Sequence, residues 1–172
     1  MRVDFSKHEV GIILAADATK GLWSFQKITG RTRTVRQGGQ LPTEASAHTL
    51  LATALTVALR SHTKNEIQRL LYNAPRGVDK PRIIVTTLDP TFGAAINGIM
   101  CESNTAPRLR AGRNFIGVLV QQLNRFQVDF EYVPNDKDAQ ILGGWIKNTL
   151  TDPKLLDRIP SSLRPSAASQ VQ

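Results

Sequence analysis

The fold is decided by the stretch from Glu9 to Ala18, which reads EVGIILAADA. This short, mostly aliphatic run has the composition of a central strand whose two faces are both buried. It closes on an acid, Asp17, and an acid at the end of so apolar a run is costly unless it is paired or bound to a metal ion. The stretch therefore predicts the first strand of a sheet, with Asp17 as a candidate functional residue.

Two more strands are expected directly after this one. In residues 22–28 apolar and polar residues alternate around Trp23, which we expect in the core. In residues 31–37 basic residues alternate with hydroxyl or apolar ones. A turn at Thr29-Gly30 separates the two segments, and Gly38-Gly39 is expected to end the second. Together the three strands predict an antiparallel meander.

The rest of the chain alternates helices and strands. Apolar residues at helical spacing indicate the helices, and short runs of β-branched residues indicate the strands. Thr43 or Ser46 is expected to cap the first helix. In order, the expected elements are helices over 44–62 and 65–72, a strand over 82–88, helices over 92–100 and 114–126, a strand over 128–133, and a helix over 137–150.

The bulk composition fits one globular domain, since the chain has 172 residues and 41% of them are hydrophobic. We expect that domain over residues 1–150 and a flexible tail, rich in Pro and Ser, over residues 151–172. The single cysteine, Cys101, excludes an intrachain disulfide, and we expect it to be buried. The sequence has no apolar leader and no run of about 18 apolar residues. We therefore expect an intracellular protein, in the cytoplasm or nucleus or in a host cell if it is viral, and not a secreted one.

The charge of the chain points to polyanions, because 22 Lys and Arg stand against 14 Asp and Glu and give a formal charge of +8. Nucleic acid is thus the first partner to consider, although a solvated basic face that only keeps the protein soluble is the alternative. The basic residues expected to contact phosphates form two groups. The first group, on the meander, is Lys20, Arg31, Arg33 and Arg36, and the second, in a later loop, is Arg108, Arg110 and Arg113.

The order of the elements resembles that of the ribonuclease H family, and the resemblance covers residues 9–150. The triplet Asp17-Ala18-Thr19, followed by Gly21 and Trp23, is similar to the family's first-strand Asp with its small residue and hydroxyl. The resemblance implies an α/β fold. Its sheet would be mixed and five-stranded, with three antiparallel strands and then two parallel ones, and helices would flank it.

Three further acids match places where the family has acids. Glu44 lies at the start of the first expected helix, and Asp89 follows the fourth expected strand, with Phe92 one helical turn later. The last helix offers Asp136 and Asp138, of which Asp138 is favoured because it precedes the apolar face of that helix. Each acid also has a structural interpretation, since Asp-Pro is a common turn signal and acids are favoured at helix N-termini.

The resemblance implies that Asp17, Glu44, Asp89 and Asp138 bind two Mg²⁺ or Mn²⁺ ions. Two such ions, about 4 Å apart, need several carboxylate oxygens around them. The implied activity is that of an endonuclease that cleaves RNA in RNA–DNA hybrids. Holliday-junction resolvases of the same superfamily also carry an Asp-Ala pair in their last helix, as Asp138-Ala139 does here, so structured DNA is an alternative substrate.

The first helix can also be aligned differently. In a register similar to that of retroelement and viral forms, residues 47–52 cover the family's helix and Thr49 replaces the Glu. We favour Glu44, because it lies in line with the apolar stripe of the helix, whereas Thr49 projects with Thr53 and Thr56 on the other side.

The last helix departs from the family as well. A strict alignment from Val133-Pro134 puts Gln140, Ile141 or Leu142 where the family has its Asp. A domain that keeps the fold without catalysis, and that binds nucleic acid or a protein partner, is therefore the second hypothesis.

Overall fold

The computed structural model describes residues 9–29, 34–41, 45–72, 74–105 and 115–149. Several residues singled out from the sequence lie outside these ranges. They are Glu44, the tail over 151–172, and five of the seven expected phosphate contacts, namely Arg31, Arg33, Arg108, Arg110 and Arg113.

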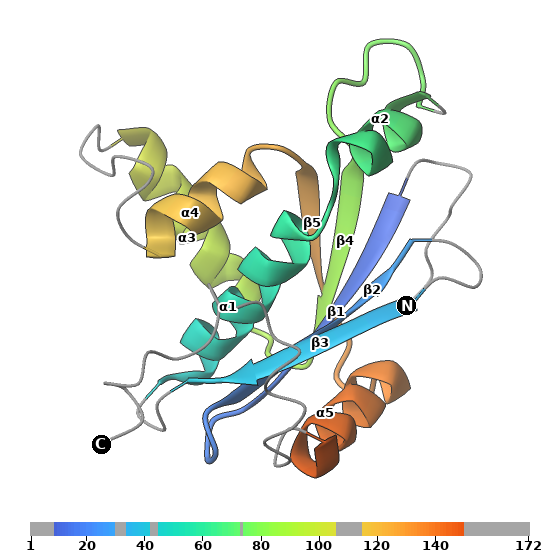
Figure 1. Ribbon diagram of the computed structural model, residues 1–172. Helices are drawn as coiled ribbons and strands as arrows, with labels where there is room; N and C mark the ends of the chain where they lie inside the picture. The colour runs from blue at the N-terminus through green and yellow to red at the C-terminus, as the bar shows by residue number, and fades with distance from the viewer. Residues whose placement is uncertain (1–8, 30–33, 42–44, 73, 106–114, 150–172) are drawn as a thin grey trace.

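The described residues form an α/β fold around one five-stranded mixed sheet (Figure 1). Its strand order is β3-β2-β1-β4-β5. Both neighbours of β2 pair with it antiparallel, whereas β4 pairs parallel with β1 and with β5. This arrangement confirms the expected sheet of three antiparallel strands followed by two parallel ones. The strands are β1 (Glu9–Asp17), β2 (Leu22–Ile28), β3 (Thr34–Gln40), β4 (Arg82–Thr87) and β5 (Gln127–Tyr132).

Helices cover the sheet on both faces. The main core lies on one face, where α1, α3 and α4 pack, and a smaller core lies beneath α5 on the other (Figure 1). Along β1, Ile12 and Leu14 enter the main core while Ile13 and Ala15 enter the smaller one, so this strand is buried on both faces, as its composition predicts. The helices are α1 (Ala47–Arg60), α2 (Lys64–Tyr72), α3 (Phe92–Thr105), α4 (Phe115–Leu123) and α5 (Lys137–Thr149).

The third strand differs from the expected one. Gly38 and Gly39 do not end it but lie inside β3, paired with Ser24 and Trp23 of β2. A Cβ atom on Gly39 would lie 2.6 Å from Cζ2 of Trp23, whose side chain is fully buried. The glycine therefore lets the indole lie directly against β3, which a local turn rule does not foresee.

The first helix begins later than expected. Ser46 is its N-cap, and the Ser46 hydroxyl accepts a hydrogen bond from the Thr49 amide, so one of the two candidate caps is confirmed. The first turn of α1 holds no acid, and the side of the helix with Thr53 and Thr56, expected opposite the apolar stripe, is buried as well. Both threonines are buried, because their hydroxyls donate to backbone carbonyls four residues earlier at 2.8 and 2.7 Å.

One expectation about burial and one about membrane-spanning segments can also be compared with the structure. Cys101, expected to be buried, is exposed on α3. None of the helices in the described residues combines the length and the apolar character needed to cross a bilayer.

Candidate functional site

Two of the predicted acids lie at the same edge of the sheet. Asp17 is the last residue of β1, and Asp89 follows β4 by two residues. Because β1 and β4 are adjacent and parallel, their carboxyl ends meet at one edge, which is where open α/β sheets place their ligands. The sequence motifs thus point to one region of the molecule.

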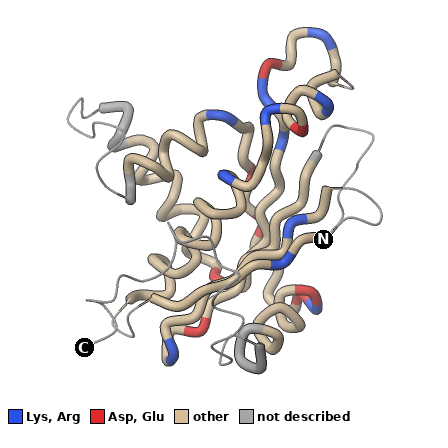
Figure 2. The backbone as a smooth tube through the Cα atoms, viewed as in Figure 1, with Lys and Arg blue, Asp and Glu red and all other residues tan. Residues whose placement is uncertain are grey.

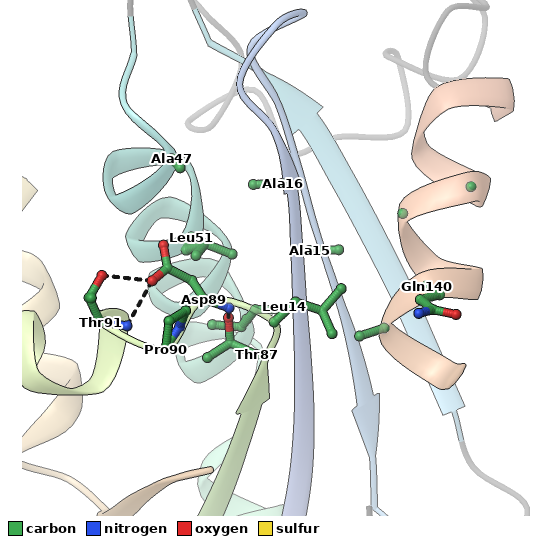
Figure 3. Close-up of a pocket in the computed structure, with 14 residues that line it drawn as sticks. Leu14, Ala15, Ala16, Ala47, Leu51, Thr87, Asp89, Pro90, Thr91 and Gln140 are labelled. Atoms are coloured by element: carbon green, nitrogen blue, oxygen red, sulfur yellow. Dashed lines mark hydrogen bonds between the residues drawn. The ribbon is translucent and has the colours of Figure 1, made fainter. Parts of the chain in front are cut away.

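A cleft of about 750 Å³ opens at this edge, between α1 and α5 (Figure 3). Small and apolar residues form most of its wall, and among the described residues that line it Asp89 is the one carboxylate. The cleft is therefore shaped mainly by backbone and small side chains. Its lining is Leu14, Ala15 and Ala16 of β1, Ala47 and Leu51 of α1, residues 87–91 after β4, and Ala139, Gln140, Gly143 and Gly144 of α5.

Asp89 is held by a local network. Its Oδ1 accepts hydrogen bonds from the amide and hydroxyl of Thr91 at 2.8 and 2.7 Å, and its Oδ2 lies 3.2 Å from Nε2 of His48 (Figure 3 draws the Thr91 contacts). The same Nε2 lies 2.8 Å from the Thr91 hydroxyl. Burial alone would raise the pKa of Asp89, but the Thr91 hydrogen bonds and His48 outweigh it and hold the pKa below its usual value. Asp89 is thus a carboxylate at neutral pH.

Asp17 has a different setting. Its Oδ1 accepts hydrogen bonds from the amide and hydroxyl of Thr19 at 3.1 and 2.5 Å, and its carbonyl accepts one from the Lys20 amide at 3.3 Å. Gly21, with φ of 66°, completes this turn into β2. Asp17 therefore shapes the β1–β2 turn and does not belong to the lining of the cleft.

The acids at the start of α5 also lie outside the cleft lining. Asp136 is buried, and its Oδ1 accepts a hydrogen bond from the Ala139 amide at 2.8 Å, so it caps the helix. Asp138 is exposed in the first turn. The polar side chain that α5 brings to the cleft is that of Gln140, one of the three residues that the strict alignment places at the family's Asp.

The residues predicted to hold two metal ions are not brought together in the described part of the chain. No three His, Cys, Asp or Glu side chains there are grouped as a metal ion requires. Asp17 and Asp89 lie at the same sheet edge, Asp138 is exposed on α5, and Glu44 is outside the described residues. The two-ion centre that the resemblance implies stays a prediction, because Glu44, one of its four ligands, lies outside the described residues.

His48 is the residue of this site that the sequence analysis missed. Its side chain is 43% exposed and contacts Asp89. It lies next to Thr49, the residue that the alternative register puts at the family's Glu. No local signal pairs His48 with Asp89, because the two meet only through the packing of α1 beside the end of β4.

The predicted phosphate contacts are only partly described. Lys20 is exposed beside the β1–β2 turn. Arg36 is exposed on β3, where its Nε donates to Oε1 of Gln26 at 2.9 Å. Both can reach solvent, and they lie on the meander as expected.

A third group of basic residues was missed. Figure 2 shows that Lys and Arg gather at the end of the molecule that carries α2. A detectable signal exists, since residues 60–82 hold six Lys or Arg against two acids. We call this the basic end, and its exposed members are Arg60, Lys64, Arg69, Arg76 and Lys80.

The sequence of this chain matches no protein-family model and no curated protein. The site is therefore defined by its geometry: a cleft of small, mostly apolar residues with one anchored carboxylate and a histidine beside it. The basic end lies apart from it, at the other end of β4.

Proposed function

We propose that this chain is a ribonuclease H-like domain that binds nucleic acid. Its main support is the sheet order β3-β2-β1-β4-β5, in which the adjacent parallel strands β1 and β4 lead to Asp17 and Asp89 at one edge. The same order of elements carries the resemblance to the ribonuclease H family. Fold alone does not define function, so the binding half of the proposal depends on charge.

The basic end supplies that charge. Its five exposed cations lie within one continuous part of the chain, on α1, α2 and the loop before β4. Lys and Arg that neutralise phosphates release counterions, which gives nucleic-acid binding a steep dependence on salt. The cleft itself favours binding over cleavage, because α5 presents Gln140 there, one of the residues that the strict alignment puts at the family's Asp.

Cleavage of a phosphodiester, as by a ribonuclease H or a resolvase, is the second candidate function. It is favoured by the two aspartates at the ends of neighbouring parallel strands. Mg²⁺ or Mn²⁺ would be its cofactor. Binding is the first candidate because the described residues hold no group of three His, Cys, Asp or Glu side chains that could bind a metal ion.

Binding is tested by the fluorescence anisotropy of a labelled RNA–DNA hybrid, a double-stranded RNA and a four-way DNA junction, at salt from about 50 to 200 mM. Arg69→Gln is compared with Lys137→Gln, an exposed charge on α5. We expect Arg69→Gln to weaken binding and to reduce the slope of log K against log salt by about 0.9, and Lys137→Gln to leave both unchanged. Absence of binding to all three probes would overturn the proposal.

Cleavage is tested on the same substrates in Mg²⁺ and in Mn²⁺. Asp17→Asn and Asp89→Asn are compared with Asp79→Asn, a matched change at an exposed loop position. Cleavage that the first two variants lose and the third retains would establish the second candidate. Binding without cleavage would leave the first.

A further inference from the structure

The last strand of the sheet has an open edge. In the described residues β5 is the terminal strand and pairs only with β4. The amides of Gln127 and Val133, at its two ends, donate to carbonyls at the ends of β4 at 2.9 and 3.3 Å. Successive residues of a strand direct their backbone groups to opposite sides, so the residues between these inward-facing positions alternate. Those whose amides and carbonyls face the open edge are Val128, Phe130 and Tyr132.

A groove of about 450 Å³ runs along this edge, between β5 and α3. Phe130 packs against Phe92 at its base, with ring centroids 5.8 Å apart. Gly93 lets α3 approach closely, because a Cβ there would lie 2.8 Å from Cβ of Phe130. Tyr132 is 49% exposed at the end of the groove, and Asn97 of α3 also lines it. The groove thus offers a backbone edge, an aromatic ring and an amide side by side.

The charge of this groove is opposite to that of the chain. Its charged lining residues are Asp89, Asp129 and Glu131, all acids, whereas the whole protein carries +8. Asp129 is paired with Arg82 at 2.6 Å, and Asp89 lies beside His48, while Glu131 is exposed. Such a lining repels phosphates and attracts cations. The groove is therefore suited to a positively charged partner and unsuited to nucleic acid.

We propose that β5 and this groove bind an extended basic segment of a partner protein by strand addition. The main chain of the segment pairs with the outward-facing groups of β5, and its Lys or Arg side chains contact Glu131 and stack on Tyr132. A second copy of this chain fits less well, because pairing two β5 strands would bring Asp129 and Glu131 against the same acids. The proposal does not depend on nucleic-acid binding.

The test uses an acetylated, amidated octapeptide of alternating Arg and Thr, with an analogue in which Glu replaces each Arg. Amide hydrogen exchange of the ¹⁵N-labelled full chain is followed by NMR with and without saturating peptide. We expect the basic peptide to slow exchange at Val128, Phe130 and Tyr132 at least tenfold and to leave Asp129 and Glu131 unchanged, because their amides already face β4. The acidic analogue is expected not to bind.

A charge reversal distinguishes binding in this groove from nonspecific electrostatic attraction between the peptide and the protein. Glu131→Lys is expected to lower the affinity for the basic peptide at least tenfold. Asp79 is an exposed acid in the loop before β4, and Asp79→Lys is expected to leave this affinity unchanged. The proposal is overturned if the peptide does not bind, if it binds without protecting the three outward amides, if the acidic analogue binds equally, or if the same amides become protected by self-association of the protein alone.

Discussion

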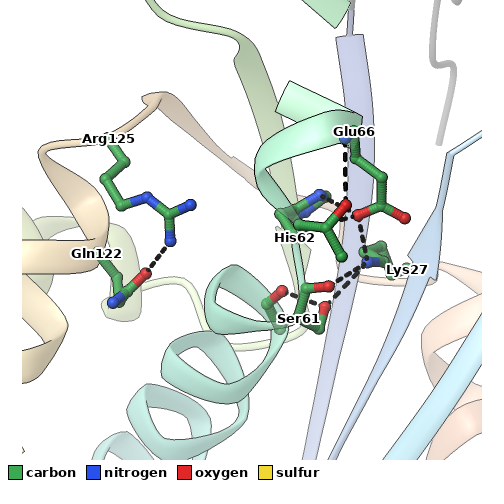
Figure 4. Close-up of polar contacts among 8 residues, drawn as sticks. Lys27, Ser61, His62, Glu66, Gln122 and Arg125 are labelled. Atoms are coloured by element: carbon green, nitrogen blue, oxygen red, sulfur yellow. Dashed lines mark hydrogen bonds and ion pairs between the residues drawn. The ribbon is translucent and has the colours of Figure 1, made fainter. Parts of the chain in front are cut away.

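Acid is expected to destabilise this protein through one buried histidine. His62 follows α1 and is 3% exposed, and neither ring nitrogen has a hydrogen-bond partner among the described residues. Figure 4 shows it between Arg125 and Lys27, with Glu66 beside it. Burial, together with the charges of Lys27 and Arg125, lowers the pKa of His62 to about 4, although Glu66, whose Oε2 lies 3.8 Å from Nδ1, acts in the opposite direction. His62 is therefore neutral in the folded protein at pH 7.

The size of the effect follows from the difference between the folded and unfolded states. In the unfolded chain the imidazole has its ordinary pKa of 6.5, so between pH 6.5 and about 4 the unfolded state binds a proton that the folded state does not. The free energy of unfolding therefore falls as the pH falls through this window. At about 1.4 kcal/mol per pH unit, the loss attributable to His62 is on the order of 3 kcal/mol.

Urea unfolding of the natural protein and of His62→Leu, from about pH 7 to about pH 4, isolates this effect because all other titrating groups are shared. The natural protein is expected to lose about 3 kcal/mol more than the variant over this range. At pH 7 the variant is expected to be at least as stable, because leucine buries no unpaired nitrogen. Parallel loss of stability in the two proteins, or an NMR titration of His62 with a midpoint near 6.5, would refute the reasoning.

Three further changes test the packing and the helix caps by thermal or urea unfolding. Gly39→Ala is expected to destabilise by about 1–3 kcal/mol, because its Cβ would overlap Trp23; Gly98→Ala, in an open position of α3, is the control and is expected to stabilise slightly. Ser46→Ala removes the N-cap of α1 and is expected to cost about 1 kcal/mol, with Ser46→Asp as the variant that restores it. Asp136→Ala is expected to cost about 1–2 kcal/mol, and Asp136→Asn, which also accepts the capping hydrogen bond, is expected to cost less. A neutral result for Gly39→Ala, Ser46→Ala or Asp136→Ala would contradict the contact that the variant tests.

Much of the secondary structure could be predicted from local sequence. β2 has the expected bounds, β1, β4 and α2 differ from theirs by one residue at an end, and α5 begins at the expected residue. These elements were recognised because apolar periodicity and β-branched runs act over a few residues. The order of the elements also led to the correct sheet of three antiparallel and two parallel strands.

Errors occurred where a distant residue decides the local conformation. Gly39 lies inside β3 because the Trp23 side chain of β2 occupies the space that a Cβ atom at this position would fill. The sequence of β3 alone predicts a break there. The burial of Thr53 and Thr56 was missed for a related reason. Their spacing put them opposite the apolar stripe, whereas α1 is buried on nearly all sides and satisfies both hydroxyls within its own backbone. The prediction for Glu44 stays a prediction, because that residue is outside the described part of the chain.

The sequence by itself determined that Asp17 and Asp89 lie at the carboxyl ends of two strands, because the short apolar runs before them are stable only as buried strands. Only the tertiary structure decided what surrounds them. Each residue on a helix turns about 100° from the last, so where α1 and α5 begin determines which side chains reach the cleft. The structure thereby placed His48 beside Asp89 and Gln140 in the cleft lining, whereas Asp17 shapes a turn outside it.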